Sequence, residues 1–175
     1  MAGANTVEDT DDLLLERQLC FALTVASRSV VGIYKPVLEC LGLTHPQYLV
    51  MLALWERSPR TLKDISDSLL HDPATLSPLL RRLEEAGLLT RERVPGNERA
   101  LAITLTAKGA ALREQATTVP GQIRDRLHLS REEVAELHRA MTGLIAATQR
   151  EGVDASTQGA ASPSSMDAPE AKSPA

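Results

Sequence analysis

The chain has 175 residues, which is enough for one ordinary domain with or without a tail. Hydrophobic residues make up 43% of it but aromatic residues only 2%. A core of Leu, Ala, Val and Ile with few strand signals favours a mainly helical protein. No apolar run of about 18 residues is present to cross a membrane, and the acidic start lacks the basic and apolar regions of a signal peptide. We therefore expect a mainly α protein in the cytoplasm.

The net charge of −4 is unevenly distributed. Residues 1–16 carry five acids and no Lys or Arg, and residues 151–175 carry four acids and one Lys. Between them, 17–150 has 18 basic and 14 acidic side chains, a balance that permits binding to DNA phosphates without requiring it. The acidic segment 1–12 and the Ala-, Ser- and Pro-rich segment 151–175 show no periodic apolar face, so both are expected to be disordered.

Two helices are predicted in the first third of the chain. Apolar residues recur at steps of three and four over 13–41, which indicates one long helix that stops at Gly42. Thr44 is then a good N-cap, with Gln47 at the capping-box position, for a helix that runs to about Arg57. The first helix, at roughly 28 residues, would span about 42 Å, which is longer than a small domain is wide.

A helix-turn-helix is predicted next. A short helix over 62–70 is followed, after a turn, by a helix that ends at Glu85. Two residues could be the N-cap of the second helix. One is Asp72, with Pro73 at the first helical position, and the other is Thr75, which would place Pro78 in the first turn, where proline causes less strain.

A β-hairpin is predicted after these helices. The alternating runs LLTRERV at 88–94 and ERALAITLT at 98–106 flank the turn Pro95-Gly96-Asn97. Helix, turn, helix and hairpin in this order make a winged helix-turn-helix, here with its DNA-binding core over 44–106.

Long helices flank this core and predict a dimer. Helical patterns cover 106–119 and 130–149. Together with 13–41, the helices over 106–149 are expected to form a dimerisation region, because their apolar faces would be partly bare in a monomer. A two-fold homodimer would place two reading helices on successive major-groove faces of a pseudo-palindromic operator in double-stranded DNA.

The helix that ends at Glu85 is the expected reading helix, because an amphipathic helix fits the major groove of B-DNA. Short polar side chains at its start can meet base edges, and basic side chains one turn later can meet phosphates. Basic side chains of the hairpin can grip the backbone and enter the minor groove at the wing tip. The predicted DNA-contacting residues are Thr75, Ser77, Arg81, Arg82, Arg91, Arg93, Asn97 and Arg99.

The chain resembles the MarR family over 13–149, and its N-terminal half resembles the organic-hydroperoxide-resistance regulators of that family. The matching strings are LERQLCFAL at 15–23, YKPVLECLGLTHPQYLVMLALWE at 34–56, LLHDPATLSPLLRRLEEAGLLTRER at 69–93 and LTAKGAAL at 105–112. This resemblance implies a transcriptional repressor. The two cysteines lack the CxxC or Cys/His spacing of a zinc site, and we expect no cofactor and no metal.

The resemblance also implies that Cys20 is a redox sensor. Organic hydroperoxides would oxidise it to a sulfenic acid and then to a disulfide or overoxidised form, and the dimer would release its operator. No cysteine follows Cys40, which fits the subgroup that resolves the sulfenic acid with a small external thiol. Twenty helical residues would separate Cys40 from Cys20 by about 30 Å within one chain, whereas a disulfide needs Cα atoms within about 7 Å. A bridge between Cys20 and Cys40 of two subunits stays open.

The sensing thiol needs hydrogen-bond donors, and the resemblance implies that they come from the partner chain. Tyr34 matches one donor tyrosine of the family. It lies about 21 Å from Cys20 along the same helix, so it can reach only the other subunit's thiol. Two family tyrosines are replaced here, one by Thr24 and one by His45. His45 can still donate, and a protonated His45 would favour the Cys20 thiolate.

Three other functions remain open from the sequence. One is a repressor of the same fold released by a small lipophilic ligand. Another is a thiol peroxidase that uses Cys20, although no resolving cysteine or base forms a catalytic set with it. The third is a winged helix that serves as a protein-interaction module and not as a DNA reader. We expect a regulator and not an enzyme.

Overall fold

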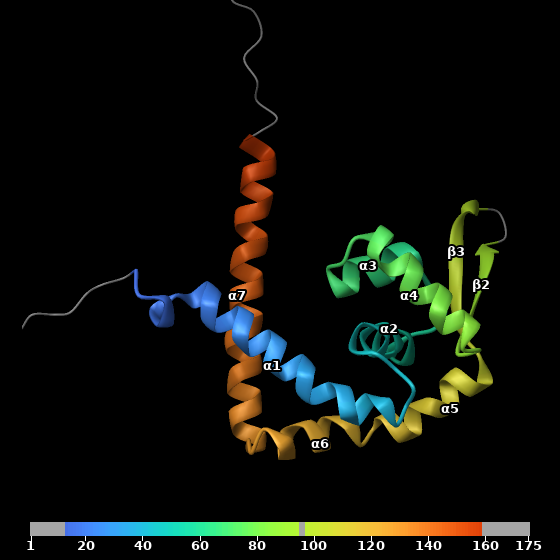
Figure 1. Cartoon of the computed structure of the whole chain (residues 1–175). Coiled ribbons are helices and arrows are strands. Elements are labelled where there is room, and N and C mark those ends of the chain that lie inside the picture. Colours follow the sequence, from blue (N-terminus) through green and yellow to red (C-terminus); the bar gives the residue numbers. More distant parts are fainter. Residues whose placement is uncertain (1–12, 95–96, 159–175) are drawn as a thin grey trace, which may run out of the picture. The chain divides into compact units, whose positions relative to one another are not determined.

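The computed structural model describes residues 13–94 and 97–158, and these fall into two compact units, divided along the chain between His128 and Leu129 (Figure 1). The first unit holds, in order, η1 Leu15–Arg17, α1 Leu19–Glu39, α2 His45–Glu56, β1 Arg60–Thr61, α3 Leu62–Leu69, α4 Pro73–Glu85, β2 Leu89–Val94, β3 Asn97–Leu105, α5 Ala107–Ala116 and α6 Val119–Arg126. The second unit holds α7 Arg131–Gln158. The prediction of a mainly helical protein is confirmed.

The first long helix is shorter than predicted. Gln18 has an extended backbone, with φ −75° and ψ 121°, and separates the single turn of η1 from α1. The helix α1 therefore has 21 residues, and Cys20 lies in its first turn. The predicted stop is confirmed, because Gly42 has φ +66°, a conformation that glycine adopts without steric cost.

The predicted start of the next helix is also confirmed. The backbone N–H of Thr44 donates to Oε1 of Gln47 at 2.9 Å, which closes the capping box of α2. The helix buries Val50, Met51 and Leu54 in the core. It is therefore the central helix of the winged domain.

The winged helix-turn-helix is present as predicted, with one additional strand. The three strands form an antiparallel sheet in the order β1-β3-β2, in which Arg60 pairs with Ile103 and Leu89 with Leu105. The strand β1 has two residues, too few for an alternating pattern to reveal it. The core under the sheet and helices consists of aliphatic side chains, among them Leu38, Met51, Leu54, Ile65, Leu76, Leu80, Leu83, Leu89 and Ile103.

The reading helix begins at the earlier of its two predicted starts. A carboxylate oxygen of Asp72 accepts from the backbone N–H of Ala74 at 2.6 Å, and Pro73 is the first helical residue. The later start, at Thr75, is therefore wrong, and Pro78 lies inside the helix. The Asp72 cap and a proline at the first helical position favour this start, and they outweigh the loss of the one backbone hydrogen bond that Pro78 cannot donate.

The helix α5 is held close to the rest of the winged domain at Gly109. The indole Nε1 of Trp55 donates to the carbonyl of Gly109 at 2.8 Å. A side chain on Gly109 would overlap the backbone carbonyl of Leu88, so only glycine fits this contact. The helical pattern predicted over 106–119 is divided at Thr117 and Thr118, and Pro120 lies in the first turn of α6, where proline is tolerated.

The second unit starts as predicted but extends further. The backbone N–H of Ser130 donates to Oε2 of Glu133 at 2.7 Å, and that of Glu133 donates to Oγ of Ser130 at 3.1 Å. The helix α7 then continues to Gln158, so 151–158 is helical and the prediction of disorder there is wrong. The remaining predicted disordered segments, 1–12 and 159–175, lie outside the described residues.

Candidate DNA-reading surface and thiol site

The helix α4 has one buried and one exposed side. Leu76, Leu80 and Leu83 are buried in the core. The predicted DNA-contacting residues of this helix, Thr75, Ser77, Arg81 and Arg82, are all exposed. The helix therefore docks through its leucines and leaves a polar and basic face open to a partner.

Two of these exposed residues have local partners. The hydroxyl of Ser77 donates to the carbonyl of Pro73 at 3.0 Å, which leaves its oxygen free to accept. Nε of Arg81 lies 2.9 Å from Oε1 of Glu85, and both side chains are largely exposed. Surface pairs of this kind contribute little, so Arg81 can exchange Glu85 for a phosphate at small cost.

Arg91 is engaged differently from its predicted role as a grip on the DNA backbone. Its Nε and Nη2 donate to Oε2 of Glu84 at 2.8 and 2.6 Å, and its backbone N–H donates to Oε1 of the same residue at 3.1 Å. These hydrogen bonds lower the pKa of Glu84 below its ordinary value. The sequence showed that Arg91 alternates along a strand, but not that its side chain meets the end of α4.

The other predicted wing residues are less fully defined. Arg93 is exposed on β2. Asn97 begins β3 and Arg99 follows within the same strand, but their side chains lie outside the described residues. Their roles at the wing tip stay predictions.

Cys20 is exposed and reduced, as is Cys40. The hydroxyl of Thr24 donates to the backbone carbonyl of Cys20 at 2.7 Å. This bond turns the hydroxyl toward the helix backbone. Thr24 therefore bonds to the backbone of its own helix, and its short side chain does not extend toward a distant thiol as a tyrosine would.

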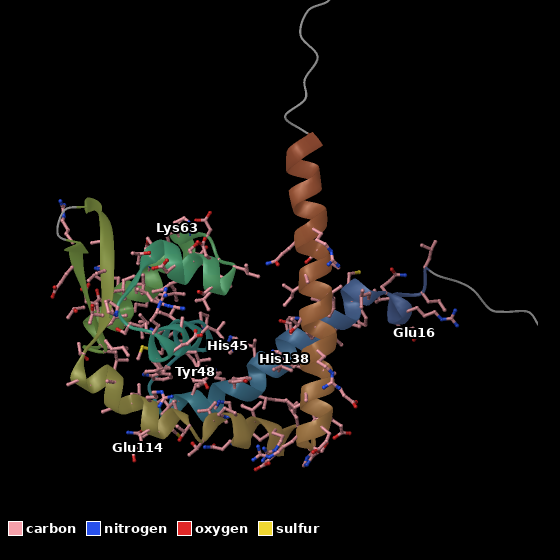
Figure 2. All side chains as sticks on the ribbon, turned by 180° about the vertical axis from the view of Figure 1, so that it is seen from behind. Glu16, His45, Tyr48, Lys63, Glu114 and His138 are labelled. Carbon is pink, nitrogen blue, oxygen red and sulfur yellow. The ribbon has the colours of Figure 1, made fainter. Side chains whose placement is uncertain are left out.

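The predicted hydrogen-bond partners of the thiol, Tyr34 and His45, lie together. Their ring centroids are 5.1 Å apart in an edge-to-face arrangement, and Tyr34 is 6.1 Å from Tyr48. Figure 2 shows His45 and Tyr48 on the same helix. Burial raises the pKa of Tyr34 and lowers that of His45. The neutral form of His45 is therefore favoured, which argues against the expectation that it acts as a cation.

Apolar side chains remain exposed on both long helices. On α1 they are Leu19, Phe21, Val25 and Val31. On α7 they are Val134, Leu137, Met141 and Ile145, at the steps of three and four that place them on one stripe. A stripe of this kind is typical of a helix that packs against another chain.

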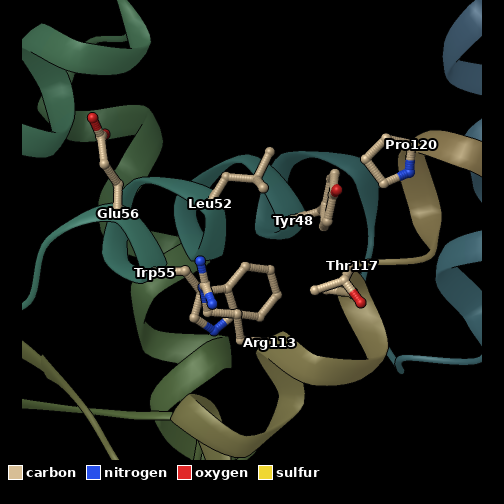
Figure 3. Close-up of a pocket in the computed structure, with 8 residues that line it drawn as sticks. Tyr48, Leu52, Trp55, Glu56, Arg113, Thr117 and Pro120 are labelled. Atoms are coloured by element: carbon tan, nitrogen blue, oxygen red, sulfur yellow. The ribbon is translucent and has the colours of Figure 1, made fainter.

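A cavity of about 350 Å³ lies between α2 and the α5–α6 segment. Figure 3 shows Tyr48, Leu52 and Trp55 from α2 on one side, and Arg113, Thr117 and Pro120 on the other. A second cavity, of about 490 Å³, is lined by Arg28, Val31, Lys35 and His45 among others. Within 13–94 and 97–158, no group of three or more His, Cys, Asp or Glu could hold a metal ion, and no described helix is long and apolar enough to cross a membrane.

The chain is similar to regulators of known family. Residues 43–101 match the MarR family. The organic hydroperoxide resistance transcriptional regulator of Bacillus subtilis is 42% identical over 135 residues, which cover 77% of this chain and 92% of the relative. The regulator MgrA of Staphylococcus aureus is 37% identical over 137 residues, 78% of this chain and 93% of the relative.

Solved structures agree with these relatives. Reduced AbfR bound to DNA superposes with a TM-score of 0.60 at 37% identity and covers 75% of this chain and 93% of that one. AbfR has also been solved with a disulfide formed. The named relatives are regulators and not enzymes. An exposed reading helix, a wing and relatives that match nearly along their whole length lead to one assignment: the chain belongs to the MarR family of DNA-binding transcriptional regulators.

Proposed function

We propose that this regulator is a homodimeric repressor in the cytoplasm that leaves its pseudo-palindromic operator when an organic hydroperoxide oxidises Cys20. The observation that carries the proposal is the placement of Cys20 and Tyr34 on one helix. Cys20 is exposed in the first turn of α1, while Tyr34 lies four turns later against His45. Similarity to an organic hydroperoxide resistance regulator supports the signal.

The chemistry requires no group beyond the thiol and its reaction partners. The Cys20 thiolate attacks the terminal peroxide oxygen, the O–O bond breaks, and an alcohol leaves after taking up a proton. The product is a sulfenic acid on Cys20. A small external thiol then condenses with it to a mixed disulfide and releases water. Tyr34 and a neutral His45 of the partner subunit each supply one hydrogen-bond donor, which would orient the thiolate.

The dimer is part of the proposal because the thiol site is incomplete without it. The distance from Cys20 to Tyr34 along α1 is about 21 Å, so one chain cannot bring them together. The exposed apolar side chains of α1 and α7 supply surface for a second copy. In such a dimer, Cys20 has its hydrogen-bond donors only when the two chains are assembled, so loss of the dimer would also remove the sensor site.

DNA contact is proposed through α4 and the wing. Thr75 and Ser77 would meet base edges, and Arg81 and Arg82 would meet phosphates, because all four lie on the exposed face of α4. Arg93, Asn97 and Arg99 would meet the backbone and minor groove from the wing.

The test compares wild type with Cys20→Ser and Cys40→Ser on the promoter fragment upstream of the protein's own gene. Reduced wild type should bind, and cumene hydroperoxide with a small thiol should release it. Cys20→Ser should bind equally well and stay bound after treatment. Cys40→Ser is the matched control and should behave as wild type. Release of Cys20→Ser by the peroxide would contradict the redox proposal.

A second candidate function is release by a small lipophilic ligand. The cavity between α2 and α5–α6 favours it, because aromatic and aliphatic side chains line it together with the basic side chain of Arg113. Leu52→Arg would fill this cavity from an exposed position. If a lipophilic ligand in this cavity causes release, Leu52→Arg should stay bound to DNA when the ligand is added. If oxidation of Cys20 causes release, the same variant should still leave DNA on peroxide treatment.

A further inference from the structure

An ion pair connects the end of the reading helix to the base of the wing. Glu84 lies in the last turn of α4, and Arg91 is the third residue of β2. Both carboxylate oxygens are used: Oε1 accepts the backbone N–H of Arg91, and Oε2 accepts its Nε and Nη2. The guanidinium is thus fixed in orientation as well as in position.

This pair is better protected from solvent than the pair of Arg81 and Glu85 on α4. The side chains of Arg91 and Glu84 are 28% and 35% exposed, compared with 73% and 59% for Arg81 and Glu85. Water and salt therefore screen it less. Because the pKa of Glu84 is lowered by Arg91, the carboxylate stays ionised well below neutral pH.

The short turn between the two elements is also fixed. Gly87 has φ +71°, and its carbonyl accepts from the hydroxyl of Thr106 at 2.7 Å. The carbonyl of Ala86 accepts from Nζ of Lys108 at 2.8 Å. The base of the wing is held by α5 from one side and by Glu84 from the other.

The expected DNA contacts on α4 and on the hairpin both lie at a distance from this base. Thr75 is nine residues before Glu84 on α4, about 14 Å away. Asn97 pairs with Val94, which is three residues after Arg91 on β2, so it lies about 10 Å along the hairpin. A tilt of about 10° at the base would move Asn97 by about 2 Å, which is still more than a hydrogen bond tolerates.

We propose that Glu84 and Arg91 are positioning residues for DNA recognition. They hold the wing at the angle at which α4 and the wing tip enter a major groove and the adjacent minor groove together. Arg91 then acts through Glu84 and is not a phosphate contact. The inference rests on the proposed DNA-reading roles of α4 and the wing.

The test uses Glu84→Gln in the full chain, because the two readings predict opposite signs for it. If Arg91 were a phosphate contact restrained by Glu84, removing the carboxylate charge would free the arginine and tighten binding. If the pair positions the wing, Glu84→Gln should weaken binding to the promoter fragment about tenfold, the size of one lost base or phosphate contact. Glu85→Gln is the control: it removes an equal charge from the same helix and should bind as well as wild type or slightly better.

Arg91→Lys keeps the charge but not the two-pronged geometry. It should weaken binding nearly as much as Arg91→Gln, and the double variant Glu84→Gln/Arg91→Gln should bind no worse than either single variant. Hydroxyl-radical footprints at saturating protein should lose protection of the minor-groove sugars beside the site, whereas guanine N7 atoms in the major groove should stay protected from dimethyl sulfate. Thermal melts identify any variant that fails to fold. If Glu84→Gln does not fold, the DNA affinity of Arg91→Lys tests the proposal in its place.

The outcomes separate this inference from the proposed function. Tighter binding by Glu84→Gln, or wild-type affinity in Arg91→Lys, overturns the positioning roles and leaves the repressor proposal standing. Failure of wild type to bind the fragment at any salt concentration overturns both.

Discussion

The winged domain and the long helices α1 and α7 differ in how many of their apolar and polar groups find partners within the chain. In the winged domain, leucines of α4 are buried, helix ends are capped by Asp72 and Thr44, and an ion pair joins α4 to β2. On α1 and α7, apolar side chains such as Leu19 and Leu137 remain exposed. The first region is complete within a single chain, and in the proposed homodimer a second chain covers the other. A change in the first should therefore alter folding, and a change in the second should alter assembly.

The largest expected effect is at Gly109. Because a Cβ there would overlap the backbone of Leu88, Gly109→Ala should lower the free energy of unfolding by about 3 kcal/mol. Gly143→Ala on α7 is the matched control, since a Cβ there meets open space, and it should raise helix stability by up to about 1 kcal/mol. Urea denaturation followed by circular dichroism measures both. Equal effects would contradict the close contact.

The second prediction concerns assembly. Leu137→Lys/Met141→Lys places two charges on the apolar stripe of α7 and should raise the dissociation constant of the dimer about 100-fold or more, with helix content retained. Ala135→Lys/Ala146→Lys adds the same charge away from the stripe and should leave the dimer intact. Sedimentation equilibrium distinguishes the two, and an intact dimer in the first variant would remove α7 from the proposed interface.

A smaller effect is expected at the cap of the reading helix. Asp72→Ala removes the acceptor of the Ala74 N–H and should cost about 1 kcal/mol of unfolding free energy. Asp67→Ala removes only an exposed pair with Lys63 and should cost less than about 0.5 kcal/mol. If thermal melting gave the two variants the same stability, the Asp72 cap would have no energetic role.

The smallest effect concerns pH and His45. Burial lowers the pKa of His45 in the folded protein, so the unfolded chain takes up its proton first as pH falls. This residue's contribution to stability is present above its ordinary pKa near 6.5 and is lost as pH falls through the lower folded value. His45→Phe should have a flatter stability profile over this range in urea denaturation. A profile parallel to that of wild type would show that burial does not shift this group.

Much of the winged domain was predictable because local chemistry specifies it. The capping box of Thr44 and Gln47, the stop at Gly42 and the hairpin around 95–97 each use residue types with strong positional preferences. The break at Gln18 was not predictable, because Leu14 and Leu15 continue the apolar period of the helix beyond it.

The candidate sites show the same limit. The exposed face of α4 follows from helical periodicity, and Thr75, Ser77, Arg81 and Arg82 are all exposed on it, while their contacts with DNA stay a prediction. The role of Arg91 depends on how β2 lies against α4, and no pattern within a strand records that. The two-residue strand β1 likewise exists only because β3 lies beside it.

The bond between Trp55 and Gly109 has a practical consequence. Trp55 is the single tryptophan of the chain, and its indole joins α2 to α5. Its ring is 6.2 Å from Tyr48, which is 6.1 Å from Tyr34, the proposed partner of the oxidised thiol. A rearrangement that starts at Tyr34 therefore has a path of ring contacts to the only indole fluorophore. Its emission can report the transition in real time without any added label.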